Sequence, residues 1–183
     1  WRVPFMHNAF ENAAATLSGI ETAYRSLLGQ GKISGKIKFI AFGGDGGTYD
    51  IGLQSLSGAM ERGHDMLYVC YDNEAYMNTG IQRSSSTPFC AATSTSPVGK
   101  ASRGKKQYPK DLTNIMVAHR LPYVAQASPH NWQDLMAKTR KALSIEGPKF
   151  MNVISSCHRG LRVPMTDSLE VCRLAVESCY WPL

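Results

Sequence analysis

The fold is decided by the stretch Lys38-Phe39-Ile40-Ala41-Phe42-Gly43-Gly44-Asp45-Gly46-Gly47. Its first half is a short and mostly apolar run, which is typical of a strand buried on both faces of a parallel sheet. The glycines that follow predict a tight turn at the end of this strand, and Asp45 lies among them. We therefore expect a strand over residues 37–42 and a turn that carries one carboxylate.

The residues after this turn predict a second, parallel strand. Residues 51–62 carry apolar side chains near helical spacing, at Ile51, Leu53, Leu56 and Met60. Residues 65–71 are again mostly apolar and are typical of a strand. A strand, a helix and a strand in this order form a right-handed crossover unit in which both strands run the same way.

The second strand also ends in a polar turn, Asp72-Asn73-Glu74-Ala75-Tyr76-Met77-Asn78-Thr79-Gly80. Because the carboxyl ends of parallel strands meet at one sheet edge, we expect Asp45 and Asn73 to lie close together. Asp45, the Asn73 amide oxygen and a turn carbonyl can supply the oxygen ligands that Mg²⁺ prefers, and this ion is usually shared with phosphates. Glycines beside Asp45 let backbone N–H groups approach phosphate oxygens. A glycine-rich turn alone would equally fit an ordinary strand-to-helix connection, but the second polar turn favours a metal–diphosphate site.

The two turns resemble those of the β subunits of pyruvate:ferredoxin oxidoreductases, enzymes that use thiamine diphosphate. The motifs that carry the resemblance are Gly44-Asp45-Gly46-Gly47-x-Tyr49-Asp50-Ile51-Gly52 and Tyr71-Asp72-Asn73-Glu74-Ala75-Tyr76-x-Asn78-Thr79-Gly80. Residues 1–15, 85–89 and 95–100 are similar to the same family, so the resemblance covers nearly the whole chain.

The resemblance implies a role for each residue of the two turns. Mg²⁺ would be bound by Asp45, by the Asn73 side chain and by the backbone oxygen of Ala75. Single-chain relatives have a threonine at the position of Asn73, which also offers an oxygen ligand. The cofactor diphosphate would be contacted by Gly44, Gly46, Gly47, Asn73, Glu74, Ala75, Tyr76, Met77 and Asn78. Asn78 would also act in catalysis, because its amide can stabilise charge that develops during decarboxylation.

The resemblance also implies an activity and its partners. The enzyme would decarboxylate pyruvate oxidatively with coenzyme A, giving acetyl-CoA and CO₂, and would pass electrons through iron-sulfur clusters to ferredoxin. The chain would supply the diphosphate half of a split active site, together with a pyrimidine-binding α subunit and ferredoxin-like δ and γ subunits. Three alternatives remain: the same chemistry on branched-chain 2-oxoacids, a non-oxidative thiamine-diphosphate decarboxylase or synthase, and a non-catalytic assembly module.

One late cysteine, Cys157, matches the family position that gives a fourth thiolate to a [4Fe-4S] cluster. One cysteine cannot hold a cluster, and the family's other three cysteines would precede Trp1. We therefore expect an internal part of a longer subunit, with the cluster present only in the complete subunit.

Cys70 lies in an apolar strand and is expected to be a small buried hydrophobe. Five cysteines without even spacing favour a reducing, cytoplasmic setting.

Length and composition predict a single domain. With 183 residues and 43% hydrophobic content, residues 1–183 can form one three-layer α/β domain with a mainly parallel sheet and helices on both faces. No run of about 18 apolar residues exists, which argues against a membrane span.

The net charge of +6 is partly concentrated in residues 100–110. We favour a solvated loop there over a surface for acidic ferredoxin or for coenzyme A phosphates. Nucleic-acid binding is disfavoured, because no aromatic-studded basic surface accompanies the charge.

The remaining elements follow the same alternation. Helices are expected over residues 8–28, 111–116, 130–146 and 166–178, and strands over residues 123–127 and 149–155, with a turn after the last strand. Residues 79–110 form a long loop rich in Ser, Thr, Gly and Pro, which we expect to cover the cofactor or to meet a partner subunit.

Overall fold

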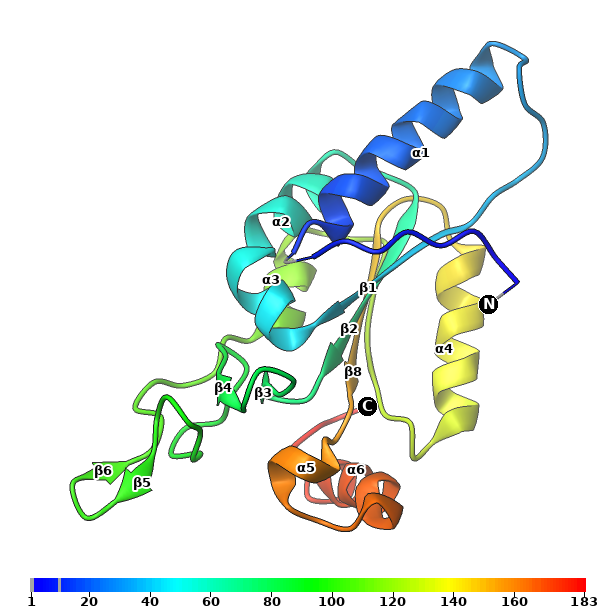
Figure 1. The fold of residues 1–183 in the computed structure, drawn as a ribbon. Helices are drawn as coiled ribbons and strands as arrows, with labels where there is room; N and C mark the ends of the chain where they lie inside the picture. The colour runs from blue at the N-terminus through cyan, green and yellow to red at the C-terminus, as the bar shows by residue number, and fades with distance from the viewer. Residues whose placement is uncertain (1, 10) are drawn as a thin grey trace.

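The computed structural model describes residues 2–9 and 11–183, so Trp1 and Phe10 of the N-terminal motif lie outside the described residues. A four-stranded sheet with the order β1-β2-β8-β7 forms the centre of the molecule (Figure 1). Its strands are β1 (Phe39–Gly44), β2 (Met66–Asp72), β8 (Lys149–Ile154) and β7 (Tyr123–Ala127). Each neighbouring pair is parallel, which confirms the predicted parallel sheet.

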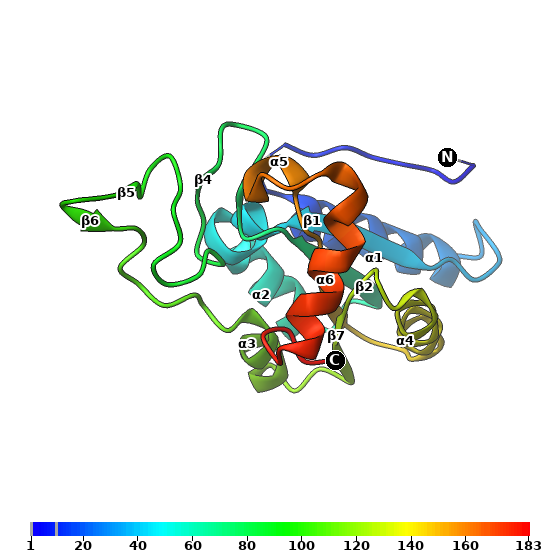
Figure 2. The same ribbon diagram turned by 90° about the horizontal axis from the view of Figure 1, so that it is seen from below.

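Helices pack on both faces of this sheet, as the three-layer prediction requires (Figures 1 and 2). The first face is covered by α1 (Ala13–Gly29), α2 (Leu53–Glu61) and α3 (Leu112–Ala118). Their apolar side chains form a core with the strand residues Tyr68 and Phe150. The second face is covered by α4 (Trp132–Ser144), whose Ala142 packs with Leu67 and Met151.

The second face is only partly covered, because α4 lies over β7 and β8. Ile40 and Phe42 of β1 pair in register with Leu67 and Val69 of β2 and therefore point to this same face. Ile40 is 39% exposed and Phe42 is 54% exposed. The edge of the sheet at β1 thus presents uncovered apolar side chains.

Most of the expected helices and strands are present, but three segments differ in detail from the sequence prediction. The helix expected over residues 51–62 is α2 preceded by a π-helix, η1 (Gly46–Ile51). The turn expected after β8 contains a short helix, α5 (His158–Leu161). The last expected helix is split into a 3-10 turn, η2 (Met165–Asp167), and α6 (Ser168–Glu177). Asp167 is the N-cap of α6 but makes no side-chain capping hydrogen bond.

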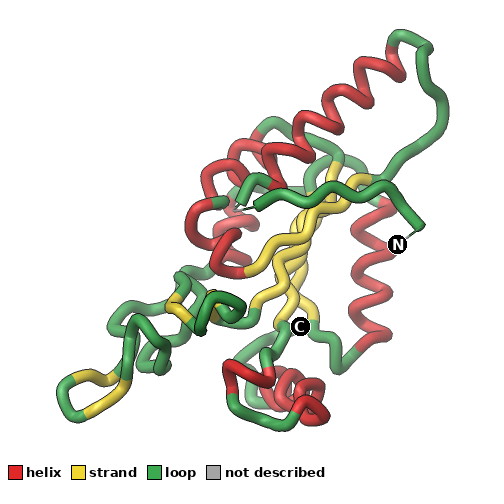
Figure 3. Tube along the Cα trace, in the orientation of Figure 1, coloured by secondary structure: helices red, strands yellow, loops and turns green. Residues whose placement is uncertain are grey.

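The long loop projects from the carboxyl edge of the sheet and is mostly irregular (Figure 3). We call residues 77–110 the arm. The arm contains β4 (Gln82–Arg83), which pairs with β3 (Ala75–Tyr76), and a hairpin of β5 (Val98–Gly99) and β6 (Ser102–Arg103). The elements α5 and α6 lie beyond the same edge (Figure 1). Among the helices in the described part of the chain, none is long and apolar enough to cross a membrane.

Candidate functional site

Asp45 directly follows β1 and stands at the start of η1. π-Helical turns are rare and are frequent at functional sites. The Asp45 side chain is almost fully buried, with 1% exposure. Its Oδ1 accepts a hydrogen bond from the Asn73 backbone nitrogen at 3.4 Å, and its Oδ2 accepts one from Ser84 Oγ at 2.5 Å. The two polar turns therefore meet at the sheet edge, as the parallel strands predicted.

Three polar groups converge where these turns meet, and we call them the oxygen site: Asp45 Oδ1, the Asn73 terminal amide and the Ala75 carbonyl. One terminal atom of the Asn73 amide lies 2.7 Å from Ala75 O and 3.0 Å from Asp45 Oδ1. If this atom is the nitrogen, it donates two hydrogen bonds; if it is the oxygen, three oxygens face one another without a proton. A cation would stabilise the second arrangement.

The spacing in the oxygen site fits Mg²⁺. Octahedral ligands at roughly 2.0–2.1 Å from Mg²⁺ stand about 2.9 Å from their neighbours, because adjacent ligands subtend a right angle. The two distances around the Asn73 amide, 2.7 and 3.0 Å, bracket this value. A carboxylate, an amide oxygen and a backbone carbonyl are also the hard ligands that this ion takes.

Negative charge is concentrated beside the oxygen site. Burial raises the pKa of Asp45 to about 7, and the nearby Asp72 carboxylate adds to this effect. Burial likewise raises the pKa of Asp72, although hydrogen bonds from Ser86 Oγ at 2.6 and 2.7 Å oppose the shift. Two buried carboxylates in one place either retain a proton or need a positive charge beside them, and a divalent cation would provide that charge.

The glycines of the first turn are required by close packing. A Cβ on Gly46 would lie 2.3 Å from the ring of Tyr76, and a Cβ on Gly47 would lie 2.1 Å from Glu11 Oε2. A Cβ on Gly44 would meet the Tyr71 ring only at an ordinary 3.6 Å. Protein side chains therefore explain why Gly46 and Gly47 lack a side chain, and their contact with a diphosphate stays a prediction.

Comparison with known proteins identifies the family. The model of "Thiamine pyrophosphate enzyme, C-terminal TPP binding domain" matches residues 1–153. The chain belongs to this family. This match confirms the thiamine-diphosphate part of the resemblance inferred from the two polar turns, because the family is named for a domain that binds this cofactor.

Individual relatives agree with this assignment. The chain is 60% identical over 185 residues to pyruvate synthase subunit PorB of Methanocaldococcus jannaschii, covering 100% of this chain and 62% of the relative. It is 49% identical over 177 residues to ketoisovalerate oxidoreductase subunit VorB of Pyrococcus abyssi, covering 97% of this chain and 57% of the relative. The chain thus spans about three-fifths of the length of these curated relatives.

A solved structure shares the fold of this family member. The 2-oxoglutarate:ferredoxin oxidoreductase from Magnetococcus marinus, solved with 2-oxoglutarate, coenzyme A and succinyl-CoA bound, superposes with a TM-score of 0.69. The match covers 90% of this chain and 58% of that one, at 21% sequence identity. At this identity the likeness supports the α/β fold alone.

The other predicted residues of the thiamine-diphosphate site are placed in different ways. Ala75 is buried at the start of β3, and the Tyr76 hydroxyl donates to Gly46 O at 2.8 Å and to Asp50 Oδ2 at 3.0 Å. Met77 packs against α5, where a Cβ on Gly160 would lie 2.3 Å from its sulfur. Asn78 is exposed between β3 and β4, and no hydrogen bond joins its side chain to another described residue.

Three serines that were not among the predicted site residues hold the carboxylates of the site. Ser84 binds Asp45, Ser86 binds Asp72, and Ser85 donates through its backbone nitrogen to Asp50 at 3.2 Å. All three lie at the base of the arm, which folds back onto the sheet edge. The run of hydroxyl residues at 84–87, shortly after the second turn, is the sequence feature that could have predicted these contacts.

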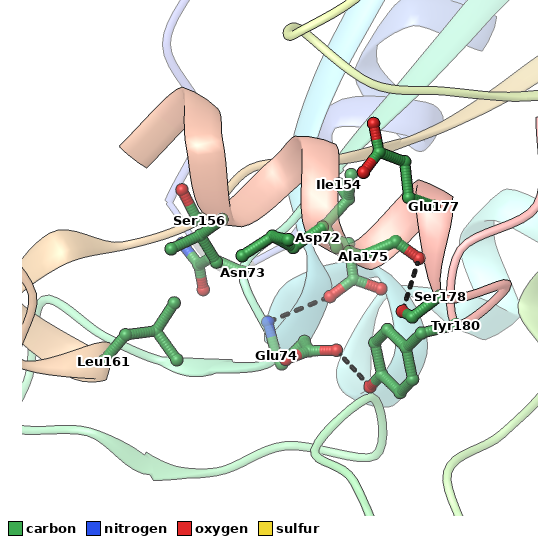
Figure 4. Close-up of a pocket in the computed structure, with 12 residues that line it drawn as sticks. Asp72, Asn73, Glu74, Ile154, Ser156, Leu161, Ala175, Glu177, Ser178 and Tyr180 are labelled. Atoms are coloured by element: carbon green, nitrogen blue, oxygen red, sulfur yellow. Dashed lines mark hydrogen bonds between the residues drawn. The ribbon is translucent and has the colours of Figure 1, made fainter. Parts of the chain in front are cut away.

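A cavity of about 550 Å³ adjoins the second turn (Figure 4). It lies between the ends of β2 and β8 on one side and α6 on the other. Its polar lining includes Asp72, Asn73 and Glu74, and its apolar wall includes Ile154 and Leu174. Burial raises the pKa of Glu74 to about 7, and a hydrogen bond from Tyr180 opposes this rise. The Glu74 carboxylate accepts a hydrogen bond from the Tyr180 hydroxyl, and its expected contact with the diphosphate stays a prediction.

Cys157 stands at the same edge of the sheet, as the N-cap of α5, and is half-buried. Among residues 2–9 and 11–183, no group of three or more His, Cys, Asp or Glu side chains could hold a metal ion. A [4Fe-4S] cluster takes four thiolates, so the described residues do not by themselves fit such a cluster. Any cluster here would need ligands from outside the described part of the chain.

Proposed function

We propose that this chain is the diphosphate- and magnesium-binding part of a thiamine-diphosphate-dependent 2-oxoacid:ferredoxin oxidoreductase of the pyruvate synthase type. The observation that carries the proposal is that one terminal atom of the Asn73 amide lies 2.7 Å from the Ala75 carbonyl oxygen and 3.0 Å from Asp45 Oδ1. The whole enzyme would convert pyruvate and coenzyme A to acetyl-CoA and CO₂ and reduce ferredoxin. The 60% identity to a subunit named for pyruvate synthase supports this substrate.

Each residue of the site would have one task. Asp45, Asn73 and Ala75 would bind Mg²⁺, with Ser84 orienting the Asp45 carboxylate through its 2.5 Å hydrogen bond. Gly44 and the backbone of the second turn would lie against the diphosphate. Thiamine diphosphate, when bound, supplies the carbanion-stabilising chemistry that 2-oxoacid decarboxylation needs. The exposed Asn78 would donate its amide to charge that develops on the substrate.

The site would be completed by other subunits. Glu11 accepts a hydrogen bond from Tyr68 at 3.3 Å, and Glu74 is bound by Tyr180, so both glutamates already have partners in this chain. The glutamate that activates the cofactor would accordingly come from a pyrimidine-binding α subunit. Ferredoxin-like γ and δ subunits would carry electrons, and Cys157 would contribute one thiolate to a cluster in the complete subunit. We place the enzyme in the cytoplasm, which the five free cysteines support.

A second candidate function is the same reaction on branched-chain 2-oxoacids. The observation that favours it is the 49% identity to a ketoisovalerate oxidoreductase subunit over 97% of this chain. The oxygen site would serve both substrates equally, because it binds the cofactor rather than the side chain of the acid.

The test is acceptor reduction by the complete enzyme under anaerobic conditions. Pyruvate and branched-chain 2-oxoacids are compared at fixed coenzyme A, thiamine diphosphate and Mg²⁺. We expect coenzyme-A-dependent reduction that prefers pyruvate, while preference for a branched acid would support the second candidate. Aldehyde formation without acceptor reduction would instead indicate a non-oxidative decarboxylase.

A variant of the metal ligand tests the site itself. Asp45→Asn keeps the shape of the side chain but removes the charge, and we expect Mg²⁺-dependent binding of thiamine diphosphate to weaken by more than roughly 100-fold. Asp167→Asn, at an N-cap that makes no capping hydrogen bond, is the control and should bind normally. Unchanged binding in Asp45→Asn would refute the proposed metal site.

A further inference from the structure

Glu74 has a backbone conformation that side-chain-bearing residues rarely adopt. Its φ angle is +68°, in the left-handed region, although it is not a glycine. It stands between Asn73 and Ala75, two members of the oxygen site. Outside helix ends, such a conformation persists only where the surroundings over-determine it, and active sites and ligand clamps are places where it clusters.

Three hydrogen bonds hold Glu74 in this conformation. Its backbone nitrogen donates to Asp72 Oδ1 at 2.9 Å, and its backbone oxygen accepts a hydrogen bond from Thr87 Oγ1. Its side-chain Oε1 accepts a hydrogen bond from the Tyr180 hydroxyl. Only the third of these comes from the C-terminal segment, which follows α6 and lies far from the two turns in sequence.

Glu74 and Tyr180 lie in the wall of the cavity beside the oxygen site. Figure 4 shows Glu74 and Tyr180 pointing toward each other, with the Asp72 carboxylate beside the Glu74 backbone nitrogen. Both side chains line the cavity. Through this pair, the segment after α6 contacts the one residue that joins Asn73 to Ala75.

We propose that Glu74 and Tyr180 form a positioning pair that directs the Ala75 carbonyl toward the bound cation. The inference rests on the proposed function, because it assigns the cation to the oxygen site. The left-handed φ of Glu74 sets the direction in which the backbone enters Ala75, and the Ala75 carbonyl lies in the next peptide group along the chain. Loss of the Tyr180 contact would let the turn adopt other conformations, and part of the cation's binding energy would then be used to order it.

The test measures cation affinity in the full-length protein with its partner subunits. Mn²⁺ replaces Mg²⁺ and is titrated by electron paramagnetic resonance in the presence of thiamine diphosphate. We expect Tyr180→Phe and Glu74→Ala each to weaken Mn²⁺ binding roughly 10-fold or more. Glu74→Gln keeps an acceptor for the Tyr180 hydroxyl, so this variant should bind Mn²⁺ with nearly normal affinity. Tyr108→Phe, at an exposed tyrosine of the arm, is the control.

A double variant shows whether Glu74 and Tyr180 act on Mn²⁺ binding together or independently. If the two side chains act together, Tyr180→Phe combined with Glu74→Ala binds Mn²⁺ no more weakly than the worse single variant. Additive losses, or normal affinity in Tyr180→Phe, would overturn the inference while leaving the proposed function intact. Failure of the unmodified protein to bind Mn²⁺ with thiamine diphosphate would overturn both. Because Tyr180→Phe removes only one hydroxyl group, it keeps the test decisive even if Glu74→Ala does not fold.

Discussion

The ring of Tyr76 fills the space beside the α-carbon of Gly46. A Cβ on Gly46 would lie 2.3 Å from one ring carbon, and the Tyr76 hydroxyl donates to the Gly46 carbonyl at 2.8 Å. The same hydroxyl donates to Asp50 Oδ2 at 3.0 Å. This contact fastens the turn after β1 to the turn after β2, and it does so beside the oxygen site.

Gly46→Ala should therefore destabilise the protein. The added methyl group would displace the Tyr76 ring and weaken both hydrogen bonds of its hydroxyl, so we expect the free energy of unfolding to fall by roughly 1–3 kcal/mol. Urea denaturation of the full-length subunit measures this change. Gly19→Ala is the matched control, because a Cβ there meets nothing within 4 Å in the exposed part of α1. It should gain about 1 kcal/mol from helix propensity. A gain in both variants would contradict the packing argument.

The parts of the site that follow strands directly could be predicted from the sequence. Parallel pairing fixes where a strand ends, so the apolar runs before Asp45 and Asn73 sufficed to bring these residues to one edge. The apolar pattern carried no information on the π-helical turn after Asp45, because its geometry depends on the close packing of Tyr76 and Glu11 against glycines.

The contacts made by distant segments could not be predicted in this way. Ser84 reaches Asp45 only because the arm folds back, and Tyr180 reaches Glu74 only because α6 covers the strand ends. The spacing of apolar and polar residues in the sequence predicts neither contact. The left-handed conformation of Glu74 is equally hidden, because glycine is the residue that normally marks it.

Substitutions of two asparagines should separate catalysis from metal binding. Asn78 is exposed, whereas the Asn73 amide is part of the oxygen site. We expect Asn78→Ala to lower kcat about 10²- to 10³-fold, as for loss of one charge-stabilising donor, with Mg²⁺ affinity unchanged. Asn73→Ala should weaken Mg²⁺ binding instead. Steady-state kinetics and Mg²⁺ titration are both needed, and the assignment of Asn78 fails if its variant loses only cofactor affinity.

Glu11 should make the stability of the protein depend on pH. Burial raises the pKa of the Glu11 carboxyl group, and a hydrogen bond from Tyr68 only partly offsets this. The folded state therefore holds this proton more tightly than the unfolded state, so stability falls as pH rises through the range above the ordinary glutamate value of about 4.3. Glu11→Gln has no such proton to lose.

The measurement is the free energy of unfolding at several pH values above about 4. We expect a shallower decline in Glu11→Gln than in the unmodified protein. Glu61→Gln, at an exposed position at the end of α2, should leave the slope unchanged and serves as the control. Equal slopes in all three proteins would show that Glu11 is solvated in both states.

Two neighbouring lysines of the arm should behave in opposite ways. Lys105 belongs to the basic segment of residues 100–110, but it is only 2% exposed. Its ammonium group donates to the backbone oxygens of Ser85 and Thr87, which lie at the base of the arm. Lys106 is exposed.

Lys105→Met should therefore reduce stability by about 1–3 kcal/mol, because two carbonyl groups would lose their buried donor. Lys106→Met should leave stability within about 0.5 kcal/mol, as is usual at the surface. If the exposed charges of the arm attract an acidic electron acceptor, Lys106→Met should also slow acceptor reduction at low salt, and this difference should vanish as salt screens the attraction. Denaturation and salt-dependent kinetics on the same two variants distinguish the roles. Normal stability with slower reduction in Lys105→Met would assign this lysine to the docking surface after all.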